Sequence, residues 1–129
     1  MSGAPITVYN GGRLRRDFTF VDDIVDGVIG CMDRPPAAGS PARILNIGNS
    51  RSEPVSLLID LLEQALGKAA IRVDAPRPLA DVEETCASVD AIGALTGFAP
   101  CTPLSAGIPR FAAWFQTWRA GRERRADGA

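Results

Sequence analysis

The chain has 129 residues and a formal net charge of −1. This length accommodates one domain with a modest core but not a two-domain enzyme. It contains no histidine, which excludes Ser-His-Asp and Cys-His nucleophile systems and imidazole metal sites. No apolar run approaches the roughly 18 residues of a membrane span, and the start lacks a basic segment followed by an apolar one, so we expect a cytoplasmic protein without a membrane partner.

The first half of the chain predicts a strand, a turn, a helix and a second strand. Residues 6–9 are β-branched or aromatic and run into the turn-forming residues 10–12. The turn is expected to carry the arginines that follow. Apolar residues recur at helical spacing over 21–32, and a second strand is predicted over 43–47.

The clearest helix of the sequence is predicted in the middle of the chain. Ser52 suits a helix cap, Pro54 suits the first helical position, and an apolar face continues to Gly67. A short third strand is predicted over 70–73.

The last third of the chain predicts a loop and two further helices. The proline-bearing segment 74–81 is expected to be loop, and a short helix is predicted over 89–95. Thr102 and Pro103 begin the last helix. Its apolar face ends before 121–129, which is predicted as a disordered tail because its composition turns to Arg, Glu, Asp and Gly.

Neither the cysteines nor the paired acids predict a metal site. Cys31, Cys86 and Cys101 are odd in number and form no Cys-x-x-Cys pair, which argues against disulfides and zinc. Asp22 and Asp23 are interpreted as carboxylates that satisfy free amide donors at a helix start, because hard cations need more oxygen ligands than this segment supplies. Nucleic acid is not expected as a partner, since nearby carboxylates balance the arginines.

Several patches of sequence, in the same order and spacing, resemble one family. Residues 15–25, Arg-Arg-Asp-Phe-Thr-Phe-Val-Asp-Asp-Ile-Val, resemble the Arg-Asp-Phe-Thr/Ile-Tyr/His-Val-x-Asp signature of UDP-sugar epimerases of the extended short-chain dehydrogenase type, most closely the UDP-glucuronate 4-epimerases. Residues 45–49 are similar to that family's Tyr-Asn-Ile-Gly strand end, and 81–85 to its Gly-Asp-Val-x-x-Thr motif. The match continues through 97–100 and 102–108. It covers nearly the whole chain and implies the carboxyl-terminal, substrate-binding part of such an enzyme.

The resemblance implies a set of substrate-binding residues. In this family the strand corresponding to residues 6–9 lies along the uracil, so Thr7, Val8 and Tyr9 would line the base. Arg16 corresponds to the arginine that reaches the diphosphate. A guanidinium suits this role because it presents fixed parallel donors and keeps its charge at any working pH.

The loop after the third predicted strand is implied to complete that site. Asp81 corresponds to the family's aspartate that holds a ribose hydroxyl or a nearby basic group. The family's preceding glycine is Ala80 here, and Arg77 stands in for a basic or amide residue whose position is displaced.

The catalytic machinery of the family has no counterpart in this sequence. Its members bind NAD through a Gly-x-x-Gly-x-x-Gly turn and use a Tyr-x-x-x-Lys pair as general base. The only tyrosine here is Tyr9 and the only lysine is Lys68. Gly27-x-x-Gly30 follows no predicted strand and is interpreted as helix packing. We therefore predict no catalytic, NAD-binding or metal-binding residues, and expect the chain alone to be inactive.

The resulting prediction is an α/β chain, α+β as an isolated piece, with about three short strands and four helices. Residues 1–120 would form the substrate-binding domain. Its partners would be a UDP-sugar and an N-terminal Rossmann half that holds NAD. Without that half, the strand over 43–47 and apolar helix faces would be exposed, which favours dimerisation or rearranged pairing.

Two other functions remain open at this point. The parent enzyme could be a dehydratase, reductase or decarboxylase that acts on nucleotide sugars, since fold does not determine chemistry. Alternatively, the chain could be a stand-alone, non-enzymatic module that binds a nucleotide or a protein.

Overall fold

A computed structural model describes residues 3–39 and 42–126, and over this range it is a mixed α/β structure, as predicted. In chain order its elements are β1 (Ile6–Tyr9), the 3-10 turn η1 (Asn10–Gly12), β2 (Arg15–Asp17), α1 (Val21–Met32), β3 (Ser52–Pro54), α2 (Val55–Leu66), β4 (Arg72–Ala75), α3 (Asp90–Thr96) and α4 (Leu104–Ala126).

The described strands form two small sheets rather than one large sheet. β1 pairs in parallel with β4, with Tyr9 opposite Ala75, and β2 pairs antiparallel with β3. The edge of β2 opposite β3 is also hydrogen bonded: Arg15 N donates to Glu83 O at 2.9 Å and Thr85 N donates to Arg15 O at 3.2 Å. β2 is therefore held between β3 and the segment 83–85, although only the β3 side is a regular ladder.

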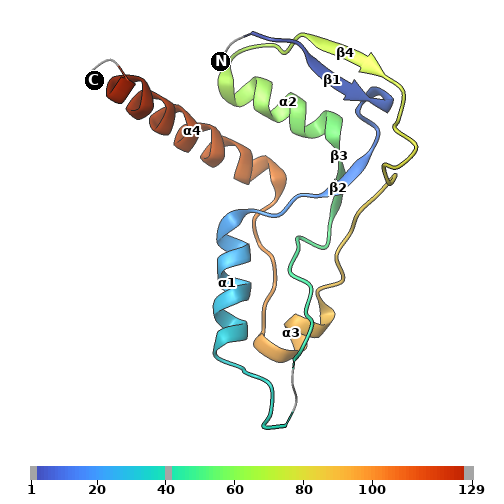
Figure 1. Ribbon diagram of the computed structural model, residues 1–129, viewed down its shortest axis with the longest axis vertical. Helices are drawn as coiled ribbons and strands as arrows, with labels where there is room; N and C mark the ends of the chain where they lie inside the picture. Colours follow the sequence, from blue (N-terminus) through green and yellow to red (C-terminus); the bar gives the residue numbers. More distant parts are fainter. Residues whose placement is uncertain (1–2, 40–41, 127–129) are drawn as a thin grey trace.

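The main core lies between the parallel strand pair and two helices. Figure 1 shows α2 lying along β1 and β4, with α4 beside α2, and α1 with α3 at the other end of the molecule. Strand residues alternate between faces, so Val8 is only 5% exposed while Thr7 and Tyr9 face away from the core. The buried apolar side chains are Val8, Leu14, Ile59, Ile92, Ile108 and Ala112.

Two glycines of α1 pack against neighbouring segments, which confirms the packing interpretation of Gly27-x-x-Gly30. A Cβ added at Gly27 would lie 3.0 Å from Ile47, and one added at Gly30 would lie 3.1 Å from Thr96. These close approaches attach the segment after residue 42, and α3, to the same helix.

The predicted strand over 43–47 is wrong for the described chain. It pairs with no strand among residues 3–39 and 42–126, and Ile44 is 94% exposed. A strand needs a neighbour to satisfy its backbone donors and acceptors. None of the described segments provides one; Ile47 is held by its contact with α1, and the Arg43 side chain donates a hydrogen bond to Arg34 O at 3.3 Å.

Three further elements also differ from the predictions. Ser52 lies in β3 and caps nothing: α2 begins at Val55, and no side chain caps it. The strand predicted over 70–73 is β4, two residues later. The arginines after β1 were expected in a turn, yet Arg15 and Arg16 belong to β2, because β3 and 83–85 satisfy their backbone.

The last helix runs further than expected. α4 continues to Ala126, through six residues of the predicted tail, because the Arg, Glu and Ala residues there are good helix formers. Residues 127–129 lie outside the described part of the chain.

Helices α1 and α4 carry exposed apolar side chains, in agreement with the prediction of uncovered helix faces. On α1 these are Val21, Val25, Val28, Ile29 and Met32, and on α4 they are Phe111, Trp114 and Trp118. No helix within the described ranges is long and apolar enough to cross a membrane.

Candidate functional site

The parallel pairing of β1 and β4 brings the predicted binding residues to one edge of the molecule. The carboxyl ends of parallel strands meet at the same edge of a sheet, so the chain leaves Tyr9 and Ala75 side by side. After β1 it enters the turn that leads into β2, and after β4 it enters the loop that contains Arg77 and Asp81. Loops at the carboxyl ends of parallel strands are common ligand sites.

Arg16, Arg77 and Asp81 meet at this edge. Arg16 Nη2 lies 2.5 Å from Asp81 Oδ1, and both side chains are half-buried. Arg77 Nη1 donates to the backbone oxygen of Asp81 at 2.7 Å, and Arg77 Nη2 lies 3.7 Å from Glu83 Oε1. Arg16 therefore pairs with the Asp81 carboxylate and Arg77 binds the Asp81 backbone, although 65 residues of sequence separate Arg16 from Asp81.

This arrangement is chemically suited to an anion with several oxygens. A phosphate oxygen offers an arginine the same acceptor geometry as a carboxylate oxygen and more negative charge. A diphosphate could therefore replace Asp81 as the partner of Arg16. The exchange would leave the Asp81 carboxylate free to accept a hydrogen bond from a hydroxyl group.

The three residues predicted to line a base differ in the exposure of their side chains. Tyr9 is 44% exposed and Thr7 is exposed, and both lie on the face of β1 turned away from α2. The Val8 side chain is buried on the other face. Thr7 and Tyr9 can present side chains to a ligand, whereas Val8 can contribute only its backbone.

The turn after Tyr9 is built on left-handed backbone. Asn10, Gly11 and Gly12 have φ values of 52°, 59° and 73°. Arg13 Nη2 donates to Asn10 Oδ1 at 2.8 Å, which supports the turn. A Cβ at Gly12 would lie 3.0 Å from the backbone of Ser56, so the turn can pack directly on α2 only with glycine there.

Sequence reasoning missed Asp17, the residue next to Arg16 on β2. Its Oδ1 accepts a hydrogen bond from Asn49 N at 2.9 Å, and its Oδ2 accepts from Ser50 N at 3.1 Å and Ala87 N at 2.8 Å. Asp17, itself in the patch 15–25, thus bonds the end of the patch 45–49 and a residue just after the patch 81–85. Its place beside Arg16 in the first patch was the available signal.

Asp23 makes a second carboxylate junction, between α1 and the start of α4. It is 3% exposed, and it accepts hydrogen bonds from Thr102 N at 3.0 Å, Thr102 Oγ1 at 3.1 Å and the Cys101 thiol at 3.4 Å. Burial raises the pKa of Asp23, but these hydrogen bonds outweigh it, and the net effect is a pKa below the ordinary value of 3.8. The interpretation of Asp23 as a cap for its own helix is therefore wrong.

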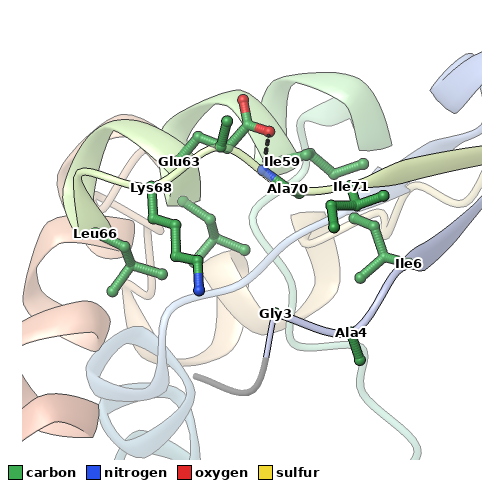
Figure 2. A pocket seen from close by; sticks show the side chains of 11 residues that line it. Gly3, Ala4, Ile6, Ile59, Glu63, Leu66, Lys68, Ala70 and Ile71 are labelled. Carbon is green, nitrogen blue, oxygen red and sulfur yellow. Dashed lines mark hydrogen bonds between the residues drawn. The ribbon is translucent and has the colours of Figure 1, made fainter.

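An apolar cavity lies elsewhere and contains none of the predicted residues. It has a volume of about 350 Å³, lies between the start of β1 and α2, and is lined by Ile6, Ile59, Leu62 and Leu66 among others. Figure 2 shows the Glu63 carboxylate turned toward the backbone of Ala70, to which it is hydrogen bonded at 2.8 Å. Convergent charged or polar groups that could orient a polar ligand are gathered at the Arg16 edge instead.

No group of three or more acidic, histidine or cysteine side chains with metal-binding geometry is found in the part of the chain that the structure describes.

Comparison with known proteins indicates a common ancestry with nucleotide-sugar enzymes. Residues 1–48 match the model of the NAD dependent epimerase/dehydratase family. A probable UDP-glucuronate 4-epimerase of Rhizobium meliloti (strain 1021) is 32% identical, with 88% of this chain and 38% of the relative aligned. UDP-glucuronate 4-epimerase 1 of Arabidopsis thaliana is 35% identical over 92% of this chain and 30% of the relative.

Solved structures extend this likeness to the fold. Epimerase Mth375 from Methanothermobacter thermautotrophicus superimposes with a TM-score of 0.79 and 26% identity, covering 94% of this chain and 36% of that one. The UDP-glucuronic acid 4-epimerase from Bacillus cereus, solved in complex with NAD, gives a TM-score of 0.66 and 25% identity over 81% and 30% of the two chains. The chain therefore spans 30 to 38% of the length of these four proteins.

Proposed function

Because the chain is a relative of the NAD-dependent nucleotide-sugar epimerases, we propose that it is the part of a UDP-sugar 4-epimerase that binds the nucleotide sugar, with UDP-glucuronate as the favoured substrate. The observation that carries this proposal is the meeting of Arg16, Arg77 and Asp81 at the edge where β1 and β4 end. The names of the two curated relatives support UDP-glucuronate over other sugars.

In this proposal each residue has a separate task. Arg16 binds the diphosphate, with Arg77 adding a second positive charge at the same loop. Asp81 exchanges Arg16 for a ribose hydroxyl when the ligand enters. Thr7 and Tyr9 lie along the base, and Val8 supports them from the core while offering its backbone.

NAD and the general base are assigned to polypeptide outside this sequence. NAD would accept hydride from C4 of the sugar and return it to the other face. This assignment is supported by Gly27 and Gly30, the nearest approach to the NAD-binding glycine motif, which pack against Ile47 and Thr96. We derive no catalytic step for this chain alone and propose that it is inactive without the remainder of such an enzyme.

The exposed surfaces suggest where that remainder would attach. The segment 43–47 pairs with no strand among the described residues, and Ile47 contacts the Gly27 side of α1, while the exposed Val21, Val25 and Met32 lie on a different side of that helix. A Rossmann half could pair with the backbone of 43–47 and bury the exposed apolar side chains of α1. Residues 1–120 would then act as the substrate-binding unit, and in the absence of that half the same surfaces would favour a homodimer.

The proposal is tested by titrating the isotopically labelled chain with UDP and with uridine and following amide shifts. We expect UDP to shift the amides of Tyr9, Arg16 and Asp81, and we expect Arg16→Gln to abolish the advantage of UDP over uridine. The matched control is Arg13→Gln, which removes a guanidinium from the same region that is hydrogen bonded to Asn10. Shifts confined to other residues would refute the site, and a protein-binding module would show no UDP shifts.

A further inference from the structure

We propose that Asp17 is a positioning residue of the nucleotide site: its carboxylate fixes the strand that carries Arg16 and thereby sets Arg16 against Asp81. The inference rests on the proposed function. It adds a residue that touches no ligand in that proposal but on which the geometry of the diphosphate contact depends.

Asp17 and Arg16 act on opposite sides of β2. They are neighbours on one strand, so their side chains leave it in opposite directions. Arg16 reaches Asp81, while Asp17 reaches the backbone of Asn49, Ser50 and Ala87. A shift of β2 along its axis would break both sets of contacts together.

The carboxylate completes a chain of bonds between β2 and the segment that leads to Asp81. Asp17 N donates to Thr85 Oγ1 at 3.2 Å, Thr85 N donates to Arg15 O at 3.2 Å, and Ala87 N donates to Asp17 Oδ2 at 2.8 Å. Residues 83–87 are thereby held in register with β2. Since Asp81 lies just before this segment, the same register determines where its carboxylate meets Arg16.

The site requires a carboxylate rather than an amide. Both oxygens of Asp17 accept from backbone N–H groups, and two of these donors, Asn49 and Ser50, are consecutive, with Ser50 at a left-handed φ of 53°. An asparagine would turn an NH2 group toward at least one backbone N–H. The backbone of Gly48 also packs closely on this carboxylate, because a Cβ added there would lie 2.9 Å from Asp17 Oδ2.

The test compares Asp17→Asn with Asp23→Asn in the complete 129-residue chain. Asp23 also accepts three hydrogen bonds, but it joins α1 to α4 and touches none of the proposed ligand residues. Both variants should lose stability. Only Asp17→Asn should reduce the preference for UDP over uridine, by about ten-fold, the scale of one charge-assisted hydrogen bond. Added to Arg16→Gln, it should cause no further loss.

A second readout needs no nucleotide. The rate at which phenylglyoxal modifies Arg16, measured by mass spectrometry against Arg13 in the same molecule, should rise in Asp17→Asn and stay unchanged in Asp23→Asn. An unchanged Arg16 rate in Asp17→Asn, or an equal rise in both variants, would overturn the positioning role. If the parent chain fails to bind UDP while the Arg16 rate still rises in Asp17→Asn, the proposed function falls and the positioning of Arg16 by Asp17 stands.

Discussion

Replacing Asp23 with asparagine should destabilise the chain and flatten its response to acid. Asp23 is buried and accepts two well-formed hydrogen bonds from Thr102 and a weaker one from the Cys101 thiol. Hydrogen bonds to a charged group contribute about 1.5–3 kcal/mol each. Asparagine keeps one acceptor oxygen but turns an NH2 group toward a donor, so we expect a loss of about 2–3 kcal/mol in the free energy of unfolding at pH 7.

The pH dependence follows from the lowered pKa of Asp23. Its pKa in the folded chain lies below the ordinary 3.8, so near pH 4 the unfolded chain binds more protons at this site than the folded chain does. The stability that Asp23 contributes is therefore present above about pH 4 and is lost as the pH falls through the folded-state pKa. The stability difference between the parent chain and Asp23→Asn should narrow in acid.

The measurement is urea unfolding followed by circular dichroism at pH 7 and at several values below pH 4. Asp22→Asn is the matched control: Asp22 is adjacent, but it is exposed and pairs only with the exposed Arg110, so its loss should cost less than about 1 kcal/mol. Two results would refute the reasoning. One is an Asp23→Asn variant as stable at pH 7 as Asp22→Asn, and the other is a stability difference that does not shrink in acid.

Two further predictions concern the turn before β2 and the outer end of α2. Gly12→Ala should lower the free energy of unfolding, measured by chemical denaturation, by about 1–3 kcal/mol. The loss should exceed that of Gly67→Ala, because both glycines have positive φ but only at Gly12 would an added Cβ lie 3.0 Å from backbone. Equal losses would contradict the close packing of the turn. Arg72→Gln should raise the pKa of Glu63, measured by carboxyl NMR titration, because the hydrogen bond from Arg72 is the largest cause of its lowering and the bond from the Ala70 amide is the next. An unchanged Glu63 pKa would show that Arg72 does not engage it in solution.

Elements with strong local signals were predicted well. β1 and α1 have the expected bounds, and α3 ends at Thr96, before Gly97. The end of α2 was also predicted, since Gly67 adopts the left-handed conformation that ends many helices. These features depend on residues close together in the sequence, so periodicity and turn chemistry suffice to locate them.

Elements that depend on a distant partner were predicted poorly. β2 has no apolar alternation, and it is a strand because β3 and 83–85 satisfy its backbone. The segment 43–47 has the composition of a strand but no partner among the described residues, and it remains unpaired. Strand pairing is a property of two segments, and neither sequence alone reveals it.

The candidate site, like the fold, was predicted in part. The family resemblance was sufficient to select Arg16, Arg77 and Asp81, and the structure brings these three together, whereas the binding role of each remains a proposal. The resemblance was not sufficient to show that Val8 points into the core, or that Asp17 supports the site from behind.

The sequence by itself determined the class of fold and the resemblance to nucleotide-sugar epimerases, because residue identity and local spacing carry that information, and from that resemblance came the proposed binding residues. Only the tertiary structure decided which groups meet. The ion pair of Arg16 with Asp81 and the junction of Asp17 with Ala87 join residues 65 and 70 positions apart. Such contacts are formed by the pairing of distant segments, whose geometry depends on the packing of the whole chain.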